Sequence, residues 1–195
     1  MASCRHVIHF NGSINPITAY NIKDVTLKAM HVNSQQGIPA ASELYYIFSS
    51  TGGDAAAGID LYNFLRGIHI PITIHNFSSM DSIASLVFLA ANTRYVVPSG
   101  RFLLHKFSMT PTTGTYDSSL FEELAMSLNS YMDIYASIFK ERVNGIEKLI
   151  DFNAVFKGNS IILDASISTE FGIAHKIIPP DNLISPYDTS WWVAP

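Results

Sequence analysis

With 195 residues, the chain is long enough to bury one substantial core and short for two, so we expect a single domain over residues 1–195. Hydrophobic residues make up 48% of it and charged residues only 14%, which suggests that part of the surface is reserved for a partner or for self-assembly. The net charge of −4, without any cluster of lysine or arginine, argues against a nucleic-acid partner and against a polybasic membrane role.

The single cysteine and the apolar runs set further limits. Cys4 has no second cysteine to pair with, which excludes an intrachain disulfide and a cysteine-rich zinc site and fits a reducing, cytoplasmic setting. The first residues contain no long apolar run, so we expect no signal peptide. The longest apolar run, around residues 86–91, is too short to cross a bilayer.

Strands and helices are expected to alternate in the first half of the chain. Alternating or continuous apolar residues indicate the strands, and apolar residues recurring every three to four positions indicate the helices. The expected elements are strands over residues 5–10, 43–50 and 70–75, and helices over residues 16–31, around 61–68 and over 83–91. This order favours an α/β layer with parallel strands and right-handed connections.

The second half begins with two short strands, over residues 94–98 and 101–105, and then changes character. Residues 106–119 are rich in glycine, proline and threonine and predict a surface loop. A long amphipathic helix over residues 118–143, about 39 Å at the usual rise per residue, is expected to project and to pack against another subunit. A strand over 159–163, a short helix and a strand over 174–178 complete the expected fold.

The tail shows no periodicity that would indicate a further helix or strand. Trp191 and Trp192 lie within it, and we expect them to serve packing or subunit contact.

Two turns carry the chemistry that the sequence suggests. The first, TGGDAAAG over residues 51–58, presents glycine N–H groups at a helix N-terminus, where they would attract an oxyanion or a phosphate. A tight turn that needs glycine for its backbone angles explains the same pattern equally well. A nucleotide site is disfavoured, because the turn lacks both the lysine of a Walker A loop and the spacing of a dinucleotide turn.

The second turn is rich in serine and precedes the apolar helix over residues 83–91. Ser82 would lie in the first turn of that helix, whereas Ser85 would be a core hydroxyl one turn deeper. Ser82 alone is more simply read as a helix cap. His105 changes this interpretation, because it ends the following strand and would return to the same edge of the sheet. A serine, a histidine and two amide-donating turns together suit acyl transfer.

Four segments of the sequence occur in a characteristic order: SSTGGDAAAG (49–58), SSMDSIASLVFLAA (78–91), RYVVPSGRFLLH (94–105) and LDASISTEFGIAHKI (163–177). They resemble the Ser-Pro-Gly-Gly turn, the nucleophile turn, the Arg-x-x-x-Pro-x-x-Arg-x-x-x-His segment and the C-terminal motif of the Clp protease proteolytic subunit (ClpP) family, in the ClpP/crotonase superfamily. The resemblance covers about residues 5–178, most of the chain, and leaves residues 179–195 as a C-terminal tail.

The resemblance implies a ClpP/crotonase-like layered α/β fold of repeated β-β-α units with a long projecting handle helix. It also implies a homo-oligomeric ring, in which the helix over residues 118–143 would interlock two stacked rings. Such a chamber would admit unfolded polypeptide fed by a separate AAA+ unfoldase, which would be the only user of ATP.

The same resemblance implies the roles of the site residues. Ser82 would be the nucleophile and His105 the general base. The backbone N–H groups of Gly52 or Gly53, together with that of Ile83, would form the oxyanion hole.

The third member of a Ser-His-Asp triad has no evident counterpart. Counting back from the C-terminal motif puts the family's aspartate at Ser160, beside Asn159, and neither residue is a carboxylate. Asp164, four residues on, is better explained as the cap of the next helix. An asparagine orients the histidine in some cysteine proteases, so activity without the aspartate is compatible with known chemistry.

Asp81, immediately before the expected nucleophile, is the second departure. A carboxylate there would oppose the developing oxyanion and could raise the pKa of the histidine. A solvated aspartate at a helix start, favoured by the helix dipole, is the simpler interpretation.

We therefore interpret the chain as a ClpP-like serine endopeptidase. One alternative is a catalytically impaired ClpP-like subunit with a structural or partner role, favoured by the missing aspartate and by Asp81. A second is a crotonase-type acyl-CoA enzyme, which shares the glycine turn but whose usual glutamates are not apparent. Neither a cofactor nor a metal is expected, because the seven histidines show no ligand spacing with carboxylates.

Overall fold

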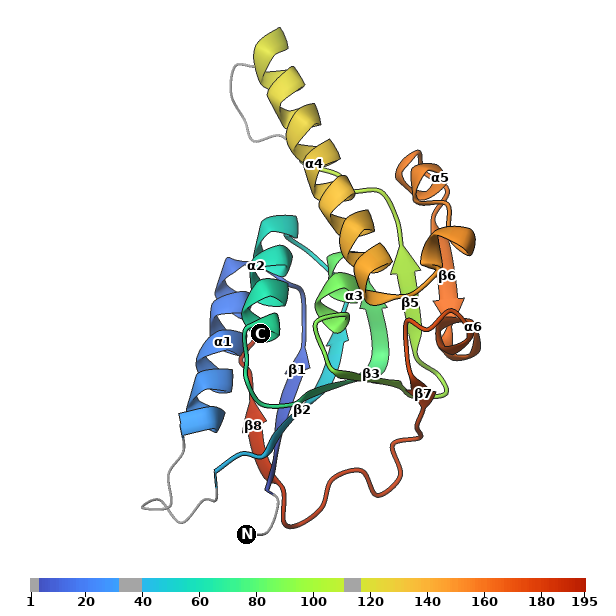
Figure 1. Ribbon diagram of the computed structural model, residues 1–195. Coiled ribbons are helices and arrows are strands. Elements are labelled where there is room, and N and C mark those ends of the chain that lie inside the picture. The colour runs from blue at the N-terminus through green and yellow to red at the C-terminus, as the bar shows by residue number, and fades with distance from the viewer. Residues whose placement is uncertain (1–3, 32–39, 111–116) are drawn as a thin grey trace.

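A mixed sheet of eight strands forms the centre of the described chain, which comprises residues 4–31, 40–110 and 117–195 of a computed structural model. The strands are β1 (Arg5–Asn11), β2 (Glu43–Ser50), β3 (Ile72–Asp81), β4 (Thr93–Val96), β5 (Arg101–Leu104), β6 (Ile161–Asp164), β7 (Lys176–Ile177) and β8 (Thr189–Trp192). The helices are α1 (Pro16–His31), α2 (Ala55–Arg66), α3 (Ile83–Phe88), α4 (Ser118–Arg142), α5 (Phe152–Phe156) and α6 (Ala165–Glu170), with a 3-10 turn at Ile146–Lys148. Helices α1, α2 and α3 lie side by side along the sheet, and α4 extends beyond it (Figure 1).

Strand β3 has two partners on the same side, one for each of its halves. Residues 73–76 pair with β4, and residues 79–81 pair with β5, both in parallel. On its other side β3 pairs with β2, which in turn pairs with β1, again in parallel. Strand β6 joins β5 in the antiparallel direction. The fork in β3 brings the end of that strand beside β5.

Most of the expected elements are present at or near the expected residues. Helix α1 and strand β2 have the expected bounds, and α4 ends one residue earlier than expected. The expectation of parallel strands is confirmed for the pairs that join β1, β2, β3, β4 and β5. Residues 111–116 of the expected polar loop lie outside the described residues.

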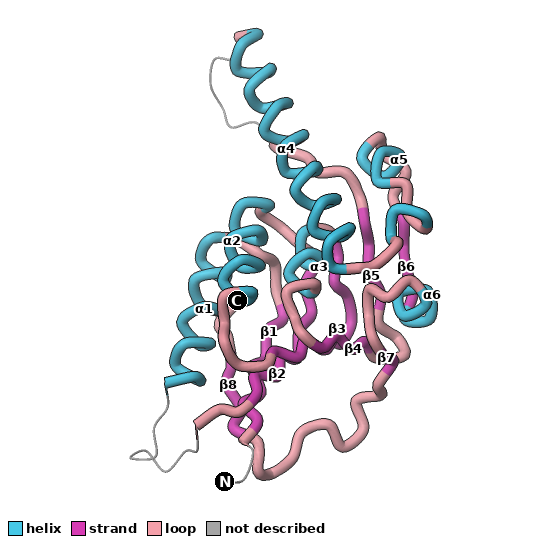
Figure 2. Tube along the Cα trace, in the orientation of Figure 1, coloured by secondary structure: helices cyan, strands magenta, loops and turns pink. Residues whose placement is uncertain are grey.

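Two expectations are wrong. Residues 76–81 were expected to form a serine-rich turn, but β3 continues to Asp81 because its second half pairs with β5. The tail was expected to lack regular structure, yet β8 lies within it and pairs with β1. In Figure 2 the segment after β7 runs along the outside of the sheet before it reaches this edge. Both errors concern pairings between residues that are distant in sequence.

Side chains around β8 explain how the tail is held. Arg5 pairs with the carboxylate of Asp188, and its Nε lies 3.1 Å from Asp188 Oδ1. Trp191 Nε1 donates to His6 Nδ1 at 3.1 Å. The ring of Trp192 stacks on His9 with centroids 4.0 Å apart, although the tryptophan is 73% exposed. Both tryptophans thus contact histidines of β1, the strand with which β8 pairs.

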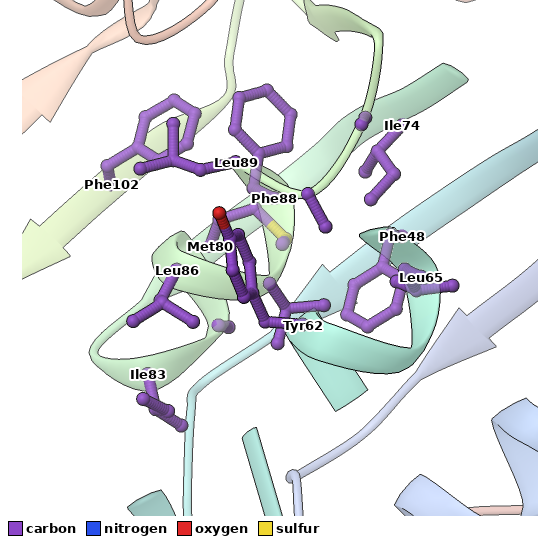
Figure 3. Packing of buried hydrophobic residues seen from close by; sticks show 14 of the residues in the cluster. Phe48, Tyr62, Leu65, Ile74, Met80, Ile83, Leu86, Phe88, Leu89 and Phe102 are labelled. Carbon is purple, nitrogen blue, oxygen red and sulfur yellow. The ribbon is translucent and has the colours of Figure 1, made fainter. Parts of the chain in front are cut away.

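The main core lies between the sheet and helices α2 and α3. Figure 3 shows Phe48, Ile74 and Met80 from the strands beside Leu65 of α2 and Leu86 of α3. These five side chains are 2% exposed or less, so α3 is surrounded by apolar neighbours as its composition predicts. In the described part of the chain, no helix is both long and apolar enough to cross a membrane.

His75 is a fully buried histidine in the middle of β3. The Tyr45 hydroxyl lies 2.8 Å from its Nδ1, and its Nε2 lies 3.1 Å from the carbonyl oxygen of Ile178. A neutral ring satisfies both contacts when Nδ1 accepts and Nε2 donates. Burial lowers the pKa of His75 to about 4, while backbone hydrogen bonds to Ile178 and Val96 act in the opposite direction.

This burial predicts a loss of stability in mild acid. The histidine of the unfolded chain takes up a proton near pH 6.5, whereas the folded chain resists protonation until about pH 4. The free energy of unfolding should therefore fall as the pH falls from about 6.5 toward 4. In His75→Gln, which cannot become charged, this decrease should be smaller when urea unfolding is followed across the same pH range. An equal decrease in the variant would contradict the prediction.

Candidate active site

Ser82 occupies a strained position between β3 and α3. Its backbone angles are φ 54° and ψ −131°, and Asn182 is the only other non-glycine residue with positive φ in the described chain. Such a conformation costs roughly 1–3 kcal/mol and persists only where the surroundings enforce it. A sharp strand-to-helix turn of this kind is the geometry that exposes the hydroxyl of a nucleophilic serine.

The surroundings fix the backbone of Ser82, while its hydroxyl has no hydrogen-bond partner among the described residues. The Ser82 N–H donates to the carbonyl oxygen of Leu103 at 2.7 Å, and its own carbonyl oxygen accepts from Ser85 Oγ at 2.6 Å. Ser82 holds the N-cap position of α3, but its side chain makes no capping hydrogen bond. The cap interpretation therefore lacks the hydrogen bond that defines it. Ser85 is fully buried, as expected for a core hydroxyl.

The glycine turn lies directly against Ser82. Gly52 and Gly53 have φ values of +87° and +146°, and a Cβ atom on Gly52 would lie only 2.6 Å from Ser82 Cβ. The Gly52 N–H donates to Ser50 Oγ at 3.1 Å. The N–H groups of Gly53 and Ile83 have no hydrogen-bond acceptor among the described residues. The turn thus needs glycine for its shape, and it leaves an amide of Gly53 free near the serine.

Ser82 and His105 line one pocket of about 460 Å³. Its walls come from the glycine turn, from the segment after β5 and from α4: Thr51, Gly53, Asp54, Ala55, Ala56, Phe107, Ser108, Met109, Thr110, Leu128 and Tyr131. No direct hydrogen bond joins Ser82 to His105 in the described structure. Catalytic hydrogen bonds are often long in proteins without substrate, so the shared pocket is the relevant observation.

His105 lies just after β5, and a hydrogen bond to the next residue orients its ring. Its Nδ1 lies 2.7 Å from the carbonyl oxygen of Lys106. Because a carbonyl can only accept, the proton of the neutral ring lies on Nδ1, and Nε2 keeps its lone pair. This tautomer is the one that can take a proton from a serine hydroxyl.

The three candidates for the third triad position are Asp164, which ends β6, and Ser160 and Asn159, which come just before that strand. The β5–β6 register pairs Leu104 with Ile161, so Ser160 comes opposite His105 just beyond the last paired residues. Ser160 and its neighbour Asn159 are exposed, and neither lines the pocket. Asp164 lies opposite Arg101 and caps α6 by accepting from the Ile167 N–H at 2.8 Å. None of the three candidates has a hydrogen bond to His105 in the described structure.

Asp81 is not the solvated residue that the sequence suggested. It is 4% exposed, because it ends β3 beside β5 rather than starting a helix. Its Oδ2 accepts from the Arg101 guanidinium at 2.9 Å, and its Oδ1 is buried without a partner among the described residues. Burial raises the pKa of Asp81, while Arg101, the backbone of Leu103 and His105 favour the charged form.

Helix α4 contributes residues whose roles the sequence alone did not suggest. The Tyr135 hydroxyl lies 2.5 Å from Ser85 Oγ, which ties α4 to the helix that follows the nucleophile. Leu128 and Tyr131 line the pocket from α4, and the amphipathic pattern of the sequence over residues 118–143 was the available signal for them. Asp54 also lines the pocket, although its carboxylate accepts from the Ala57 N–H as the cap of α2.

The chain is similar to known proteins in both sequence and structure. The family model described as Clp protease matches residues 11–181. ATP-dependent Clp protease proteolytic subunit 2 of Treponema denticola is 26% identical over 152 residues, 73% of this chain and 69% of that protein. The protein of the same name from Borreliella burgdorferi is 26% identical over 141 residues, 69% of this chain and 66% of that protein. The chain thus spans about two thirds of the length of these curated relatives.

A solved structure confirms the fold expected from the sequence. A mutant of ClpP1 from Listeria monocytogenes superposes with a TM-score of 0.69 over 91% of this chain and 93% of its own, at 16% identity. At that identity the likeness concerns the fold alone. The mixed sheet with its long projecting helix is thus a ClpP/crotonase-like α/β fold.

The contact between the glycine turn and Ser82 predicts the effect of one methyl group. Gly52→Ala should lower the free energy of unfolding by about 2 kcal/mol more than Gly145→Ala, measured by urea unfolding at equal protein concentration. Both glycines have similar positive φ, +87° and +75°, but a Cβ on Gly145 meets nothing within 4 Å. Equal losses in the two variants would show that the turn yields without disturbing Ser82.

Proposed function

The chain belongs to the Clp protease family, and we propose that it is a serine endopeptidase that hydrolyses peptide bonds of unfolded polypeptides. The observation that supports this most directly is the conformation of Ser82. Its φ is 54°, its hydroxyl makes no capping hydrogen bond, and it lines the same pocket as His105. An ordinary cap residue would stabilise the start of the helix better than a strained serine does. A structural role alone therefore does not explain the conformation of Ser82.

In the proposed reaction, Ser82 Oγ attacks the carbonyl carbon of the peptide bond while His105 Nε2 takes the hydroxyl proton. The N–H groups of Gly53 and Ile83 would donate to the oxyanion that forms; Gly52, whose N–H already donates to Ser50, would shape the turn. Protonated His105 then gives its proton to the leaving amine, which breaks the C–N bond. Water, activated by His105, hydrolyses the acyl-serine ester and regenerates the hydroxyl. No cofactor takes part.

A catalytically impaired subunit is the second candidate function. It is supported by the position opposite His105, where Ser160 offers a hydroxyl rather than a carboxylate. Removal of the triad aspartate from a serine protease lowers the rate by orders of magnitude without abolishing it. The two candidates therefore differ in how readily Ser82 reacts.

Reaction with a fluorophosphonate probe distinguishes the two candidates. We expect the parent protein to be labelled and Ser82→Ala to remain unlabelled, because the probe forms a bond only with an activated serine hydroxyl. Ser79→Ala is the matched control, since Ser79 lies in the ladder with β5 three residues before the nucleophile. Mass spectrometry of the labelled peptide checks the position. Labelling that persists in Ser82→Ala would refute the nucleophile, and an unlabelled parent would favour the impaired subunit.

The proposed assembly is a homo-oligomeric ring, two of which would stack through α4. Support comes from apolar side chains that this helix leaves uncovered: Met126 is 71% exposed and Ile134 is 36% exposed. Helix α4 also extends beyond the sheet (Figure 1), where a second copy could cover it. In this proposal the protein acts in the cytoplasm, and a separate AAA+ unfoldase delivers unfolded polypeptide and consumes the ATP.

The stacking proposal is testable by native mass spectrometry. Met126→Glu should shift the assembly to half of the parent's mass, because a charge in place of this exposed apolar side chain opposes contact between rings. Tyr187→Glu places the same charge on a residue that is 90% exposed and outside α4, and it should leave the mass unchanged. A monomeric parent protein would contradict the ring.

A further inference from the structure

The third residue of a Ser-His-Asp triad performs two tasks, which two separate groups could perform in this chain. It holds the histidine in the correct tautomer, and its negative charge stabilises the imidazolium that forms during the reaction. The carbonyl oxygen of Lys106, 2.7 Å from His105 Nδ1, already performs the first task. A neutral carbonyl contributes no full charge, so the second task is left open.

Asp81 lies where it can supply that charge. The parallel register pairs Asp81 with Leu103, and residues two apart on a strand point to the same face. Arg101 therefore lies on the face that Asp81 shares, and His105 follows directly after the last residue of β5. Asp81 Oδ2 is bound to Arg101, whereas Oδ1 is buried and unpartnered in the described structure.

Other charged or titratable groups around His105 are less suited to this task. Asp54, from the start of α2, lines the pocket but is exposed, and its carboxylate caps that helix. Lys106, the next residue on the chain, carries a charge of the opposite sign. Tyr131, from α4, lines the pocket as a neutral phenol. Asp81 is the one carboxylate in this set that is buried, where Coulomb interactions are less screened than in water.

The side on which the carboxylate lies also resolves the expected conflict with the oxyanion. The Asp81 side chain is bound to β5 through Arg101, while the free N–H groups of Gly53 and Ile83 belong to the glycine turn and to α3. The negative charge thus lies on the histidine side of Ser82. Arg101, whose side chain is 47% exposed, offsets part of the charge.

We propose that Asp81 is the positioning residue that supplies the negative charge for the imidazolium of His105, in place of a carboxylate on β6. This inference rests on the proposed peptidase function. The sequence of bond changes is unaltered, because Asp81 neither takes nor gives a proton.

The rate of fluorophosphonate labelling of Ser82 as a function of pH tests the proposal. At low pH the rate falls because His105 is protonated and cannot act as a base. Asp81→Asn removes the charge at nearly constant shape, which makes protonation of His105 harder. The acid limb should therefore move to lower pH by about one unit. The plateau rate should fall by at most about tenfold, since one pH unit corresponds to a tenfold change in basicity and the rate follows only part of it. A residue with only a structural role would lower the labelled fraction without moving the limb.

Three further variants complete the design. Asp60→Asn removes an exposed carboxylate that pairs with Lys23 and should leave the limb in place. Ser160→Asp in the Asp81→Asn background should return the limb toward the parent, because residue 160 lies opposite His105. Asp81→Ala should repeat the shift if Asp81→Asn fails to fold, since half-exposed Arg101 can then turn to solvent.

The outcomes separate this inference from the proposed function. A labelled parent whose acid limb is unmoved in Asp81→Asn and Asp81→Ala overturns the role of Asp81 and leaves the peptidase proposal standing. A shift caused by Asp54→Asn instead would also overturn it. An unlabelled parent overturns the peptidase proposal and this inference together.

Discussion

The fork in β3 is the constraint on which the candidate site depends. Its first half pairs with β4 and its last three residues pair with β5, so the chain must leave the sheet where β5 also ends. The Ser82 N–H closes this short ladder by donating to Leu103 at 2.7 Å. Without the fork, Ser82 and His105 would leave the sheet at different places. The meeting of serine and histidine is therefore a property of strand pairing rather than of either loop.

The strain at Ser82 is held by groups on both sides of it. The N–H of the serine is bound to β5, and its carbonyl oxygen is bound to Ser85, which in turn contacts the hydroxyl of Tyr135 on α4. The glycine turn can lie this close to Ser82 only because residue 52 has no Cβ, which would be 2.6 Å from Ser82 Cβ. These contacts are buried and mutually dependent, so a backbone conformation that is unfavourable in isolation becomes the only one that fits. They also couple the long helix to the position of the hydroxyl.

Local patterns predicted the elements that local interactions determine. Helix α1, strand β2 and helix α4 follow from apolar spacing and have the expected bounds to within a residue. The second half of β3 and all of β8 could not be predicted in this way, because each is a strand only by virtue of a distant partner, β5 or β1. The serines of residues 76–81 and the polar residues before Trp191 looked like loop for the same reason. Long-range pairing overrides propensity in both segments.

The candidate site also contains residues that the sequence predicted and contacts that it did not. Ser82 and His105 were reached from the sequence through their register with a known family, and the structure places both in one pocket. The surroundings of Asp81 were not predicted, since its burial and its pairing with Arg101 depend on the β3–β5 register. A carboxylate that looked like a solvated helix start is instead fixed at the end of a buried strand. Its unpartnered oxygen is visible only once the ladder is known.

The position of Asp81 bears on why residue 160 can be a serine. A carboxylate at residue 160, in addition to the buried one of Asp81, would place two negative charges around one imidazole, and each would disfavour ionisation of the other. In the proposal that Asp81 supplies the charge and Lys106 holds the tautomer, a side chain at residue 160 has no electrostatic task. Ser160 is accordingly free to remain an exposed hydroxyl. The proposal therefore links two features of the sequence: residue 160 lacks a carboxylate, and Asp81 provides one for the same histidine.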